Sequence, residues 1–342
     1  MEQVLTGLAT SAQLAGFVVA LRAKGETPAE VDALVDVMLE HARLLDFGPD
    51  GGPIALDVVG TGGDHSNTVN ISTMSALVCA AAGAPVVKHG NRAASSSTGT
   101  ADVLERLGVV IDLAPDGVVE SVRRAGIGFC FAQTHHPAMR HAGPTRRELG
   151  VPTVFNILGP LTNPGRAQAA LIGCASPTLA PVMADVLHRR GVRAIVVRGE
   201  DGLDEISTTG PTRVWDATSG PVVEGLLDSA DLGVPRTDPG LLRGGDSARN
   251  ARLLLATLAA GPAAGPDADR VVAIRDAVAV NAAAAMVAYG AAVAAATGLE
   301  PDGRDLSARV AAQLSAMRSV LESGAALDVL TGWVALTQEL RG

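Results

Sequence analysis

Aromatic side chains are scarce in this 342-residue chain, in which two Trp, one Tyr and five Phe make up 2% of the residues. Basic residues are also in the minority, because 27 Lys and Arg face 36 Asp and Glu and leave a net charge of −9. Surfaces that bind nucleic acids typically combine a basic face with stacking aromatic rings. These two deficits argue against a nucleic-acid platform.

Cysteine is equally scarce, with only Cys79, Cys130 and Cys174. Each lies in an apolar run without a second cysteine nearby, so we expect small buried core residues rather than disulfides or reactive thiols. Unpaired thiols favour a reducing compartment. Because Glu2 precedes the first apolar run and no basic cluster opens the sequence, we expect no signal peptide and a cytoplasmic protein.

Only one stretch is apolar enough to suggest a membrane span, the alanine-rich segment 276–297. It contains Asn281, Tyr289 and Gly290, and alanine drives membrane insertion only weakly. We therefore expect a buried helix or a pair of helices, and no membrane association. The length of 342 residues predicts roughly two structural units, which need neither disulfides nor a structural metal for stability.

Residues 1–48 predict a small helical domain. Residues 27–30 read Thr-Pro-Ala-Glu, a capping box with Pro at the first helical position, and apolar residues follow at helical spacing from Val31 to Leu45. A Gly- and Pro-rich segment at 47–53 then breaks the pattern. A shorter stripe marks the preceding helix: Leu14, Phe17, Val18 and Leu21.

From residue 54 onward, short apolar strands alternate with helices. The predicted strands are 54–59, 85–88, 128–132, 153–155, 169–172 and 193–198. The predicted helices between them are 75–82, 101–107, 118–124 and 177–190. This alternation is typical of a larger α/β domain with a mostly parallel central sheet, here spanning 54–342. We expect part of 136–165, rich in Pro, Arg and Gly, to join the helical domain, and residues 268–342 to be helical again.

A glycine-rich loop follows the first predicted strand. Residues 60–73 read GTGGDHSNTVNIST and lead into a helix. Glycines let backbone N–H groups approach an anion, and Ser72 or Thr73 can cap the helix whose dipole faces the same point. The segment contains neither the Gly-Lys-Ser/Thr of a P-loop nor the Gly-x-Gly-x-x-Gly of a dinucleotide site. We therefore predict an anion-binding loop of another kind.

Two more polar loops follow later strands. Residues 88–100 bring Lys88, Arg92 and a run of hydroxyls to the end of the second strand, which suits a second phosphate group. Residues 199–205 carry four carboxylates, which repel phosphate unless a hard cation lies between them; Mg²⁺ typically takes one or two carboxylates plus ligand oxygens. A solvated loop and an ordinary acidic turn are the alternatives.

Imidazoles and guanidiniums gather in residues 135–163, near the expected domain seam. This segment contains His135, His136 and Arg146 and ends in the sequence Gly-Pro-Leu-Thr-Asn. Arginine suits bidentate capture of a carboxylate. No Cys or carboxylate sets up a zinc pattern, and each histidine can equally be a packing or hydrogen-bonding residue.

Taken in order, these segments closely resemble the anthranilate phosphoribosyltransferase family, in the nucleoside phosphorylase-like class of phosphoribosyltransferases. The matching sequences are DVVGTGGD, NTVNIST, KHGNRAASS, FAQTHHPAMRHAGPTRRELG, TVFNILGPLTNP and GEDGLDEIS, with shorter matches at LGVPR, LRGGD and VNAAAA. The resemblance implies a small helical domain hinged to a larger α/β domain, and usually a homodimer formed through the helical domain. It also implies transfer of a phosphoribosyl group from 5-phosphoribosyl 1-diphosphate (PRPP) to the amine of anthranilate, with Mg²⁺, two ions per site, in tryptophan biosynthesis.

The resemblance assigns site residues by position. Those expected to hold PRPP are Gly60, Gly63, Asp64, Thr68, Asn70, Ser72, Thr73, Lys88, Asn91, Ser96 and Thr100. Those expected to line anthranilate are Gly60, Asn91, His136, Arg146, Gly159 and Pro160. Those expected to bind the metal are Ser72, Asp204 and Glu205. No catalytic residue is assigned, and His89 is the one candidate proton acceptor.

Some positions depart from the family pattern, and two other functions stay open. The departures bear on phosphate binding and local geometry, and occur at Ser97, Thr98, Gln133, Arg198 and Arg249. A pyrimidine-nucleoside phosphorylase and a non-enzymatic nucleic-acid-binding relative are the alternatives within the same fold. The acidic pair Asp204–Glu205 and the GPLTNP segment favour the transferase over the first, and the net charge of −9 disfavours the second.

Overall fold

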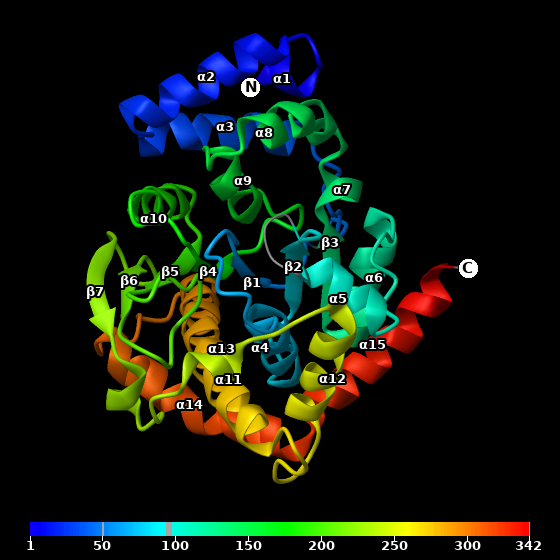
Figure 1. The fold of residues 1–342 in the computed structure, drawn as a ribbon, viewed down its shortest axis with the longest axis vertical. Coiled ribbons are helices and arrows are strands. Elements are labelled where there is room, and N and C mark those ends of the chain that lie inside the picture. The colour runs from blue at the N-terminus through cyan, green and yellow to red at the C-terminus, as the bar shows by residue number, and fades with distance from the viewer. Residues whose placement is uncertain (50, 94–97, 342) are drawn as a thin grey trace.

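The computed structural model describes residues 1–49, 51–93 and 98–341, and its centre is one seven-stranded sheet in the order β3-β2-β1-β4-β5-β6-β7 (Figure 1). The first five strands run parallel to their neighbours, and β6 and β7 add antiparallel at one edge. The expected mostly parallel sheet is confirmed. The strands are β1 (Leu56–Gly60), β2 (Val86–Gly90), β3 (Ile127–Phe131), β4 (Ala169–Gly173), β5 (Arg193–Gly199), β6 (Thr212–Asp216) and β7 (Val223–Leu227).

One predicted strand is wrong and two are missed. Residues 153–155 form no strand, because the backbone N–H of Thr153 donates to Oδ1 of Asn156 (3.1 Å) in a turn that leads into a helix. The missed strands β6 and β7 lie at the sheet edge, where β7 has exposed residues at four of its five positions and no apolar pattern announces it.

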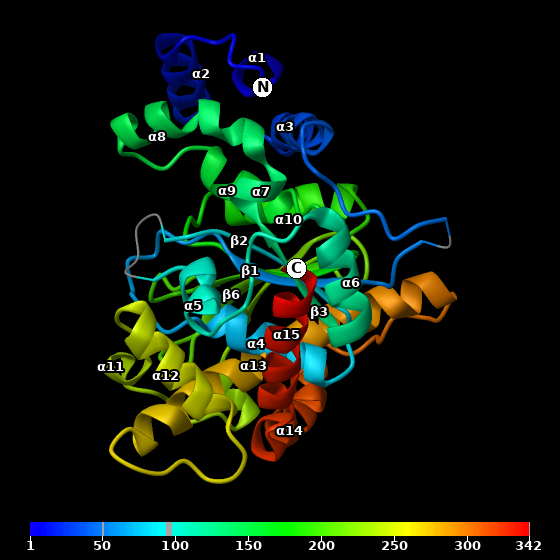
Figure 2. The same cartoon turned by 90° about the vertical axis from the view of Figure 1, so that its right-hand side faces the viewer.

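A small group of helices lies above the sheet in Figures 1 and 2. The capping box at Thr27 and Glu30 is present as predicted. In the preceding helix Leu14, Val18 and Leu21 are buried, whereas Phe17 is 41% exposed. These helices and the segments joining them to the sheet are α1 (Glu2–Leu5), α2 (Ser11–Lys24), α3 (Pro28–Glu40), α7 (Ala132–His135), η1 (Pro137–His141), α8 (Gly143–Leu149), α9 (Phe155–Leu161) and α10 (Ala180–Arg189).

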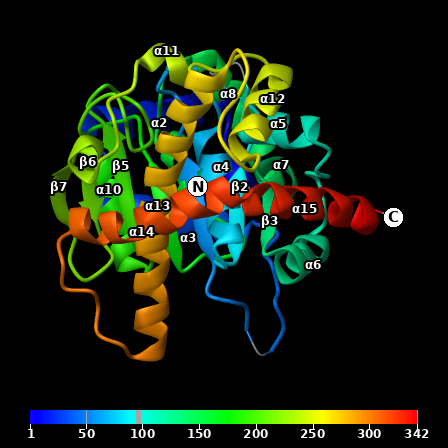
Figure 3. The same cartoon turned by 90° about the horizontal axis from the view of Figure 1, so that it is seen from below.

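The remaining helices cover the opposite face and the ends of the sheet. The alanine-rich segment is a single helix, α13, and α14 runs across it in the view from below, with α15 continuing toward the C-terminus (Figure 3). These helices are α4 (Ile71–Ala81), α5 (Thr100–Arg106), α6 (Pro115–Ala125), η2 (Ser229–Leu232), α11 (Pro239–Leu242), α12 (Ser247–Leu258), α13 (Ala268–Thr297), α14 (Leu306–Ser323) and α15 (Ala325–Arg341).

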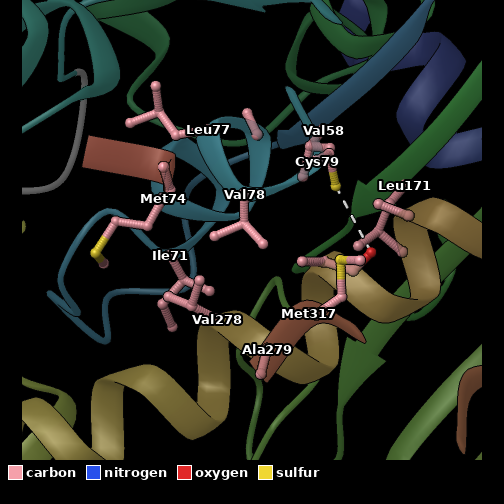
Figure 4. Packing of buried hydrophobic residues seen from close by; sticks show 14 of the residues in the cluster. Val58, Ile71, Met74, Leu77, Val78, Cys79, Leu171, Val278, Ala279 and Met317 are labelled. Atoms are coloured by element: carbon pink, nitrogen blue, oxygen red, sulfur yellow. Dashed lines mark hydrogen bonds between the residues drawn. The ribbon is translucent and has the colours of Figure 1, made fainter. Parts of the chain in front are cut away.

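Helix α13 lies in the main hydrophobic core. Its length and mean hydropathy of 1.8 would suffice to cross a membrane, but 67% of its most apolar window is buried inside the protein. Figure 4 shows Val278 and Ala279 of α13 beside Ile71 and Val78 of α4. Small alanines let the two helices approach closely, and the helix is the buried one that the sequence predicts.

Both tryptophans are buried, on opposite faces of the sheet. Trp333 of α15 packs in the core with α4 and α13, and its Nε1 donates to Oγ of Ser121 (2.8 Å). Trp215 of β6 packs in the core that includes α3 and α10, and its Nε1 donates to Oε2 of Glu224 (3.2 Å). All three cysteines are buried as expected.

The chain segments that join the upper helices to the sheet are hydrogen-bonded to one another. The backbone N–H of Arg43 donates to the carbonyl of His135 (2.8 Å), and Nδ1 of His135 donates to the carbonyl of Arg43 (2.7 Å). The N–H of Leu45 donates to the carbonyl of Pro164 (3.1 Å). These bonds join the three segments that cross between the upper helices and the sheet, at Arg43–Leu45, His135 and Pro164.

Candidate active site

The glycine-rich loop leaves the carboxyl end of β1 in an unusual backbone conformation. Gly62, Gly63, His65 and Asn67 all have positive φ angles, of 66°, 84°, 57° and 51°. Successive left-handed residues turn backbone N–H groups into a concave surface, which is a common way to bind anions. The loop for which the sequence predicts anion binding therefore has left-handed backbone at these four positions, and its binding role stays a prediction.

The cap expected for the following helix is wrong. Helix α4 begins at Ile71 and its N-cap residue is Asn70, whose side chain forms no capping hydrogen bond. Ser72 and Thr73, the expected caps, lie inside the first turn of the helix. Instead Oε1 of Glu205 accepts the backbone N–H of Ser72 (3.0 Å). A carboxylate from the acidic loop, distant in sequence, satisfies the first turn of the helix.

The four carboxylates of the acidic loop separate into two pairs. Glu200 pairs with Arg213 on the surface, and Asp201 accepts from the hydroxyls of Ser207 and Thr209, so these two are structural. Asp204 faces the glycine-rich loop, and its Oδ2 accepts the N–H of Gly62 (2.7 Å). Asp204 and Glu205 thus meet the anion loop and the start of α4, as predicted.

The electrostatics of this pair favour a bound cation. Burial raises the pKa of Asp204 well above its usual value, and the nearby Asp64 and Glu205 raise it further. Burial also raises the pKa of Glu205 to about 8, although Lys88 opposes this shift. Two buried carboxylates with a third, Asp64, nearby gain greatly from a divalent cation.

The residues present fit Mg²⁺. Two carboxylates and the Ser72 hydroxyl are the hard oxygen ligands that this ion prefers, with its remaining positions filled by water or ligand oxygens. Within the described ranges, no group of three or more His, Cys, Asp and Glu side chains gathers to hold a metal. The three oxygen donors named above would leave ligand or water oxygens to complete the coordination of the ion.

Two glycines allow Asp204 to pack against the carboxyl ends of β1 and β4. A Cβ on Gly60 would lie 2.4 Å from Oδ2 of Asp204, and a Cβ on Gly173 would lie 1.6 Å from the Asp204 carbonyl oxygen. Gly60 is a predicted site residue, whereas the sequence prediction missed Gly173. Its position at the end of β4, beside the loop of β1, was the available signal.

The loop after β2 carries one buried cation and one engaged cation. Lys88 is 1% exposed, and its Nζ donates to the carbonyl of Val58 and lies 3.4 Å from Oγ of Ser72. The expectation that Arg92 is a second phosphate-facing cation is not supported, because its guanidinium pairs with Asp102 and Glu105.

The other polar residues predicted near this loop form separate contacts. Oγ1 of Thr73 donates to Oγ1 of Thr100 (3.4 Å), and Nδ2 of Asn70 donates to the carbonyl of Thr98 (3.3 Å). Oδ1 of Asn91 accepts the N–H of the following residue (2.8 Å). Thr68 is bridged to Arg243. Ser96 and Ser97 lie outside the described residues.

Histidines and the seam segment meet on the other side of the sheet. Nδ1 of His89 donates to the carbonyl of Gly159 (2.9 Å), and the His89 and His136 rings lie 5.1 Å apart. Nε2 of His136 donates to the carbonyl of Thr162 (2.9 Å). The family resemblance groups His89, His136 and Gly159 together, and the structure brings them into contact.

Both imidazoles are neutral at pH 7. Burial lowers the pKa of His89 to about 3 and that of His136 to about 4. Because a carbonyl only accepts, Nδ1 of His89 carries the proton and Nε2 holds the lone pair. Nε2 is buried and has no hydrogen-bond partner in the part of the chain that is described.

Arg146 lies on α8, next to the helix that carries Gly159 and Pro160. Its guanidinium carbon is 5.3 Å from the centre of the Phe155 ring, at the start of α9. Over the described ranges it forms no ion pair with Glu148 or any other acid. Burial lowers its pKa. Arg146 is thus a half-buried cation that lacks an anionic partner there.

Several buried polar residues behind the site were missed. Nδ2 of Asn163 donates to Oδ2 of Asp57 (2.7 Å), which ties the seam segment to β1. Nδ2 of Asn250 donates to Oδ1 of Asn70 (3.0 Å), and its Oδ1 accepts the N–H of Gly245 (2.8 Å). A carboxylate inside the apolar run of β1 was the visible sequence signal for Asp57.

Comparisons with known proteins identify the family of the chain. Residues 52–327 match the glycosyl transferase family a/b domain, and residues 1–42 match the glycosyl transferase family helical bundle domain. An anthranilate phosphoribosyltransferase from Salinispora arenicola is 55% identical, covering 100% of this chain and 91% of the relative.

Solved structures show the same relationship. The crystal structure of anthranilate phosphoribosyltransferase from Thermus thermophilus superposes with a TM-score of 0.85 at 40% identity, covering 98% of this chain and 93% of that one. The enzyme from Saccharomyces cerevisiae in complex with PRPP and Mg has a TM-score of 0.78 at 26% identity, covering 96% of this chain and 86% of that one. Through both its domains, this chain belongs to the anthranilate phosphoribosyltransferase family.

Proposed function

We propose that this chain transfers the phosphoribosyl group of PRPP to the amine of anthranilate and releases diphosphate, as a step of tryptophan biosynthesis. The observation that carries this function is the meeting of a buried acidic pair, Asp204 and Glu205, with the left-handed anion loop at Gly62. A diphosphate with its cation matches both halves of that arrangement.

We infer that the PRPP side is held by the loops after β1 and β2. The left-handed turn at Gly62 and Gly63 is proposed to face the diphosphate, and Nζ of the buried Lys88 lies 3.4 Å from Oγ of Ser72 on the same side. The other side chains proposed to contact PRPP are Asp64, Thr68, Asn70, Ser72, Thr73, Asn91, Ser96 and Thr100. Mg²⁺ held there would supply the positive charge that makes diphosphate a better leaving group. We propose two ions per site, held by Ser72, Asp204 and Glu205.

The anthranilate side is proposed to lie at the seam. Arg146 offers a desolvated cation to the carboxylate, and the seam is lined by Gly60, Asn91, His136, Gly159 and Pro160. The bond from ribose carbon to diphosphate oxygen breaks, the amine nitrogen bonds to that carbon, and the nitrogen releases its proton to water while diphosphate leaves. With a pKa of about 3, His89 is a weak base, so positioning rather than strong base catalysis lowers the barrier.

We also propose a hinged, dimeric, cytoplasmic enzyme. Residues 1–48, joined by part of 136–165, are proposed to move as one helical domain against 54–342, because α2 packs on α8 and α3 packs on α9. The bonds among the three crossing segments at Arg43, His135 and Pro164 mark the proposed hinge. Exposed Leu8, Phe17 and Val19 make the helical domain the proposed dimer surface.

A direct assay tests the reaction. Purified protein with PRPP, anthranilate and Mg²⁺ should release diphosphate, and omission of any one of the three should stop the release. A requirement for inorganic phosphate and a nucleoside would instead identify a phosphorylase. A DNA gel shift in the same buffer should show no complex, and a stable complex would favour the nucleic-acid-binding relative.

A second test isolates the acidic pair. Asp204→Asn with Glu205→Gln should leave the melting curve cooperative and nearly abolish turnover, because the diphosphate charge would go uncompensated. The matched control is Glu200→Gln, since Glu200 lies in the same loop but pairs with Arg213 on the surface. Normal turnover by the double variant at ordinary Mg²⁺ concentrations would rule out the pair as the metal site.

A further inference from the structure

Helix α13 places one polar side chain in an otherwise apolar core, and that side chain touches the acidic loop. Asn281 is 0% exposed, and the alanines that follow it, Ala282 to Ala285, are as deeply buried. A buried amide is costly unless all its hydrogen-bonding groups are paired. The hydrogen-bond partners of the Asn281 amide therefore explain how it is accommodated in the core.

The amide of Asn281 binds both backbone polar groups of a single residue. Oδ1 accepts the N–H of Ile206 (2.9 Å), and Nδ2 donates to the carbonyl of Ile206 (3.0 Å). The second hydrogen of Nδ2 goes to the carbonyl of Ala277 (2.9 Å) in the preceding turn. The side chain thus acts like a short strand paired with Ile206, the residue directly after Glu205.

The same loop is fixed from the opposite side. The Asp204 carbonyl oxygen packs on Gly173, where a Cβ would come within 1.6 Å, and Gly62 donates to the Asp204 carboxylate. The main chain of Asp204 and Glu205 is therefore held between β4 in front and α13 behind. Little backbone freedom is left to either carboxylate.

We propose that Asn281 is a positioning residue for the metal-binding pair, holding the backbone so that both carboxylates face one point. This inference rests on the proposed function of Asp204 and Glu205. Partners that orient metal ligands from behind typically change metal affinity by about ten- to a hundred-fold when removed. Asn281 acts through the backbone, and it touches neither the metal nor PRPP.

The test is calorimetric titration of PRPP into the protein with and without Mg²⁺. In Asn281→Ala, the Mg²⁺-dependent gain in PRPP affinity should fall roughly ten- to a hundred-fold. Affinity without Mg²⁺ and the Michaelis constant for anthranilate should stay close to wild type. Asn281→Gln, which keeps the amide, should recover part of the gain.

The control separates positioning from general stability. Val287→Ala creates a cavity in the same helix, about 9 Å further along its axis, without removing a bond to Ile206. It should lower the melting temperature and leave the Mg²⁺ dependence unchanged. A wild-type Mg²⁺ response in Asn281→Ala, or equal changes in both variants, would overturn the inference. Failure of the wild-type protein to bind PRPP would instead overturn the proposed function.

Discussion

At the scale of single residues, Arg146 is a half-buried charge near the seam, and no acid among the described residues forms an ion pair with it. Its guanidinium lies over Phe155 and is half-buried. A carboxylate that paired with it would form a charge-assisted bond worth roughly 1.5–3 kcal/mol. The carboxylate-binding role of Arg146 stays a prediction, and no acid among the described residues forms an ion pair that would compete for it.

Arg146→Ala should therefore raise the Michaelis constant for anthranilate by about ten- to a hundred-fold. The constant for PRPP should change little, because its proposed site lies on the opposite side of the seam. Arg147→Ala is the matched control, since Arg147 is the exposed neighbour on the same helix. Steady-state kinetics with each substrate varied in turn decides the matter, and equal effects on both constants would contradict the assignment.

His136 leads to a second prediction at this scale, on pH. Its pKa is about 4 in the folded protein and about 6.5 in an unfolded chain. As the pH falls below 6.5, the unfolded state takes up the proton before the folded state does. The free energy of unfolding is therefore unaffected by the protonation of His136 above pH 6.5 and decreases as the pH falls from 6.5 to 4.

The stability difference between wild type and His136→Gln should consequently shrink by about 2 kcal/mol between pH 7 and pH 5. Urea denaturation of both proteins at each pH measures it, and titrating groups shared by the two proteins cancel in the comparison. A difference that does not change with pH would show that His136 is not held neutral by burial.

At the scale of elements, the carboxyl ends of β1 and β4 depend on glycine. A Cβ at Gly173 meets a backbone atom rather than a movable side chain, so the strand and the acidic loop would have to separate. Gly173→Ala should cost about 3 kcal/mol of unfolding free energy, at the upper end of overpacking effects. Gly210→Ala, where a Cβ meets nothing within 4 Å, should change it by about 0.5 kcal/mol or less. Denaturant unfolding of both variants provides the measurement, and similar losses would refute the close-approach argument.

Elements also show what the sequence could and could not predict. The capping box at Thr27 and the polar loops after β1 and β2 are local signals, and they lie where predicted. The errors are nonlocal. Residues 153–155 have strand-like composition but enter a helix, and Arg92 pairs with acids of α5 rather than with a ligand. Similarly, the cap of α4 comes from Glu205, which no local pattern reveals.

At the scale of the whole molecule, the chain length indicated two units, and the alternation of short apolar strands with helices indicated a mostly parallel sheet. Nothing in it indicated that Asn281 would stand behind the acidic loop, since that contact joins residues 75 positions apart. The burial of Asp204 and Glu205, and the pKa shifts that burial causes, arise from packing between segments that are distant in sequence.

The exposed apolar face of α2 leads to a prediction on assembly. Phe17→Glu should shift the protein from dimer to monomer in analytical ultracentrifugation, because a charge would be buried in the proposed interface. Leu299→Glu is the control, since Leu299 is 66% exposed at the far end of α13. If only the Leu299→Glu variant becomes monomeric, or if the Phe17→Glu variant stays dimeric, the dimer interface does not lie on α2.

The placement of the two tryptophans has a practical consequence for optical experiments. Both belong to the α/β part, one on each face of the sheet, and the helices α1 to α3 contain none. Their emission should therefore report unfolding of the large domain with a low background, since only one tyrosine accompanies them. Helices α1 to α3 contain no tryptophan, so a tryptophan introduced at Phe17 would be the one indole in these helices. Its fluorescence would report movements of the helical domain.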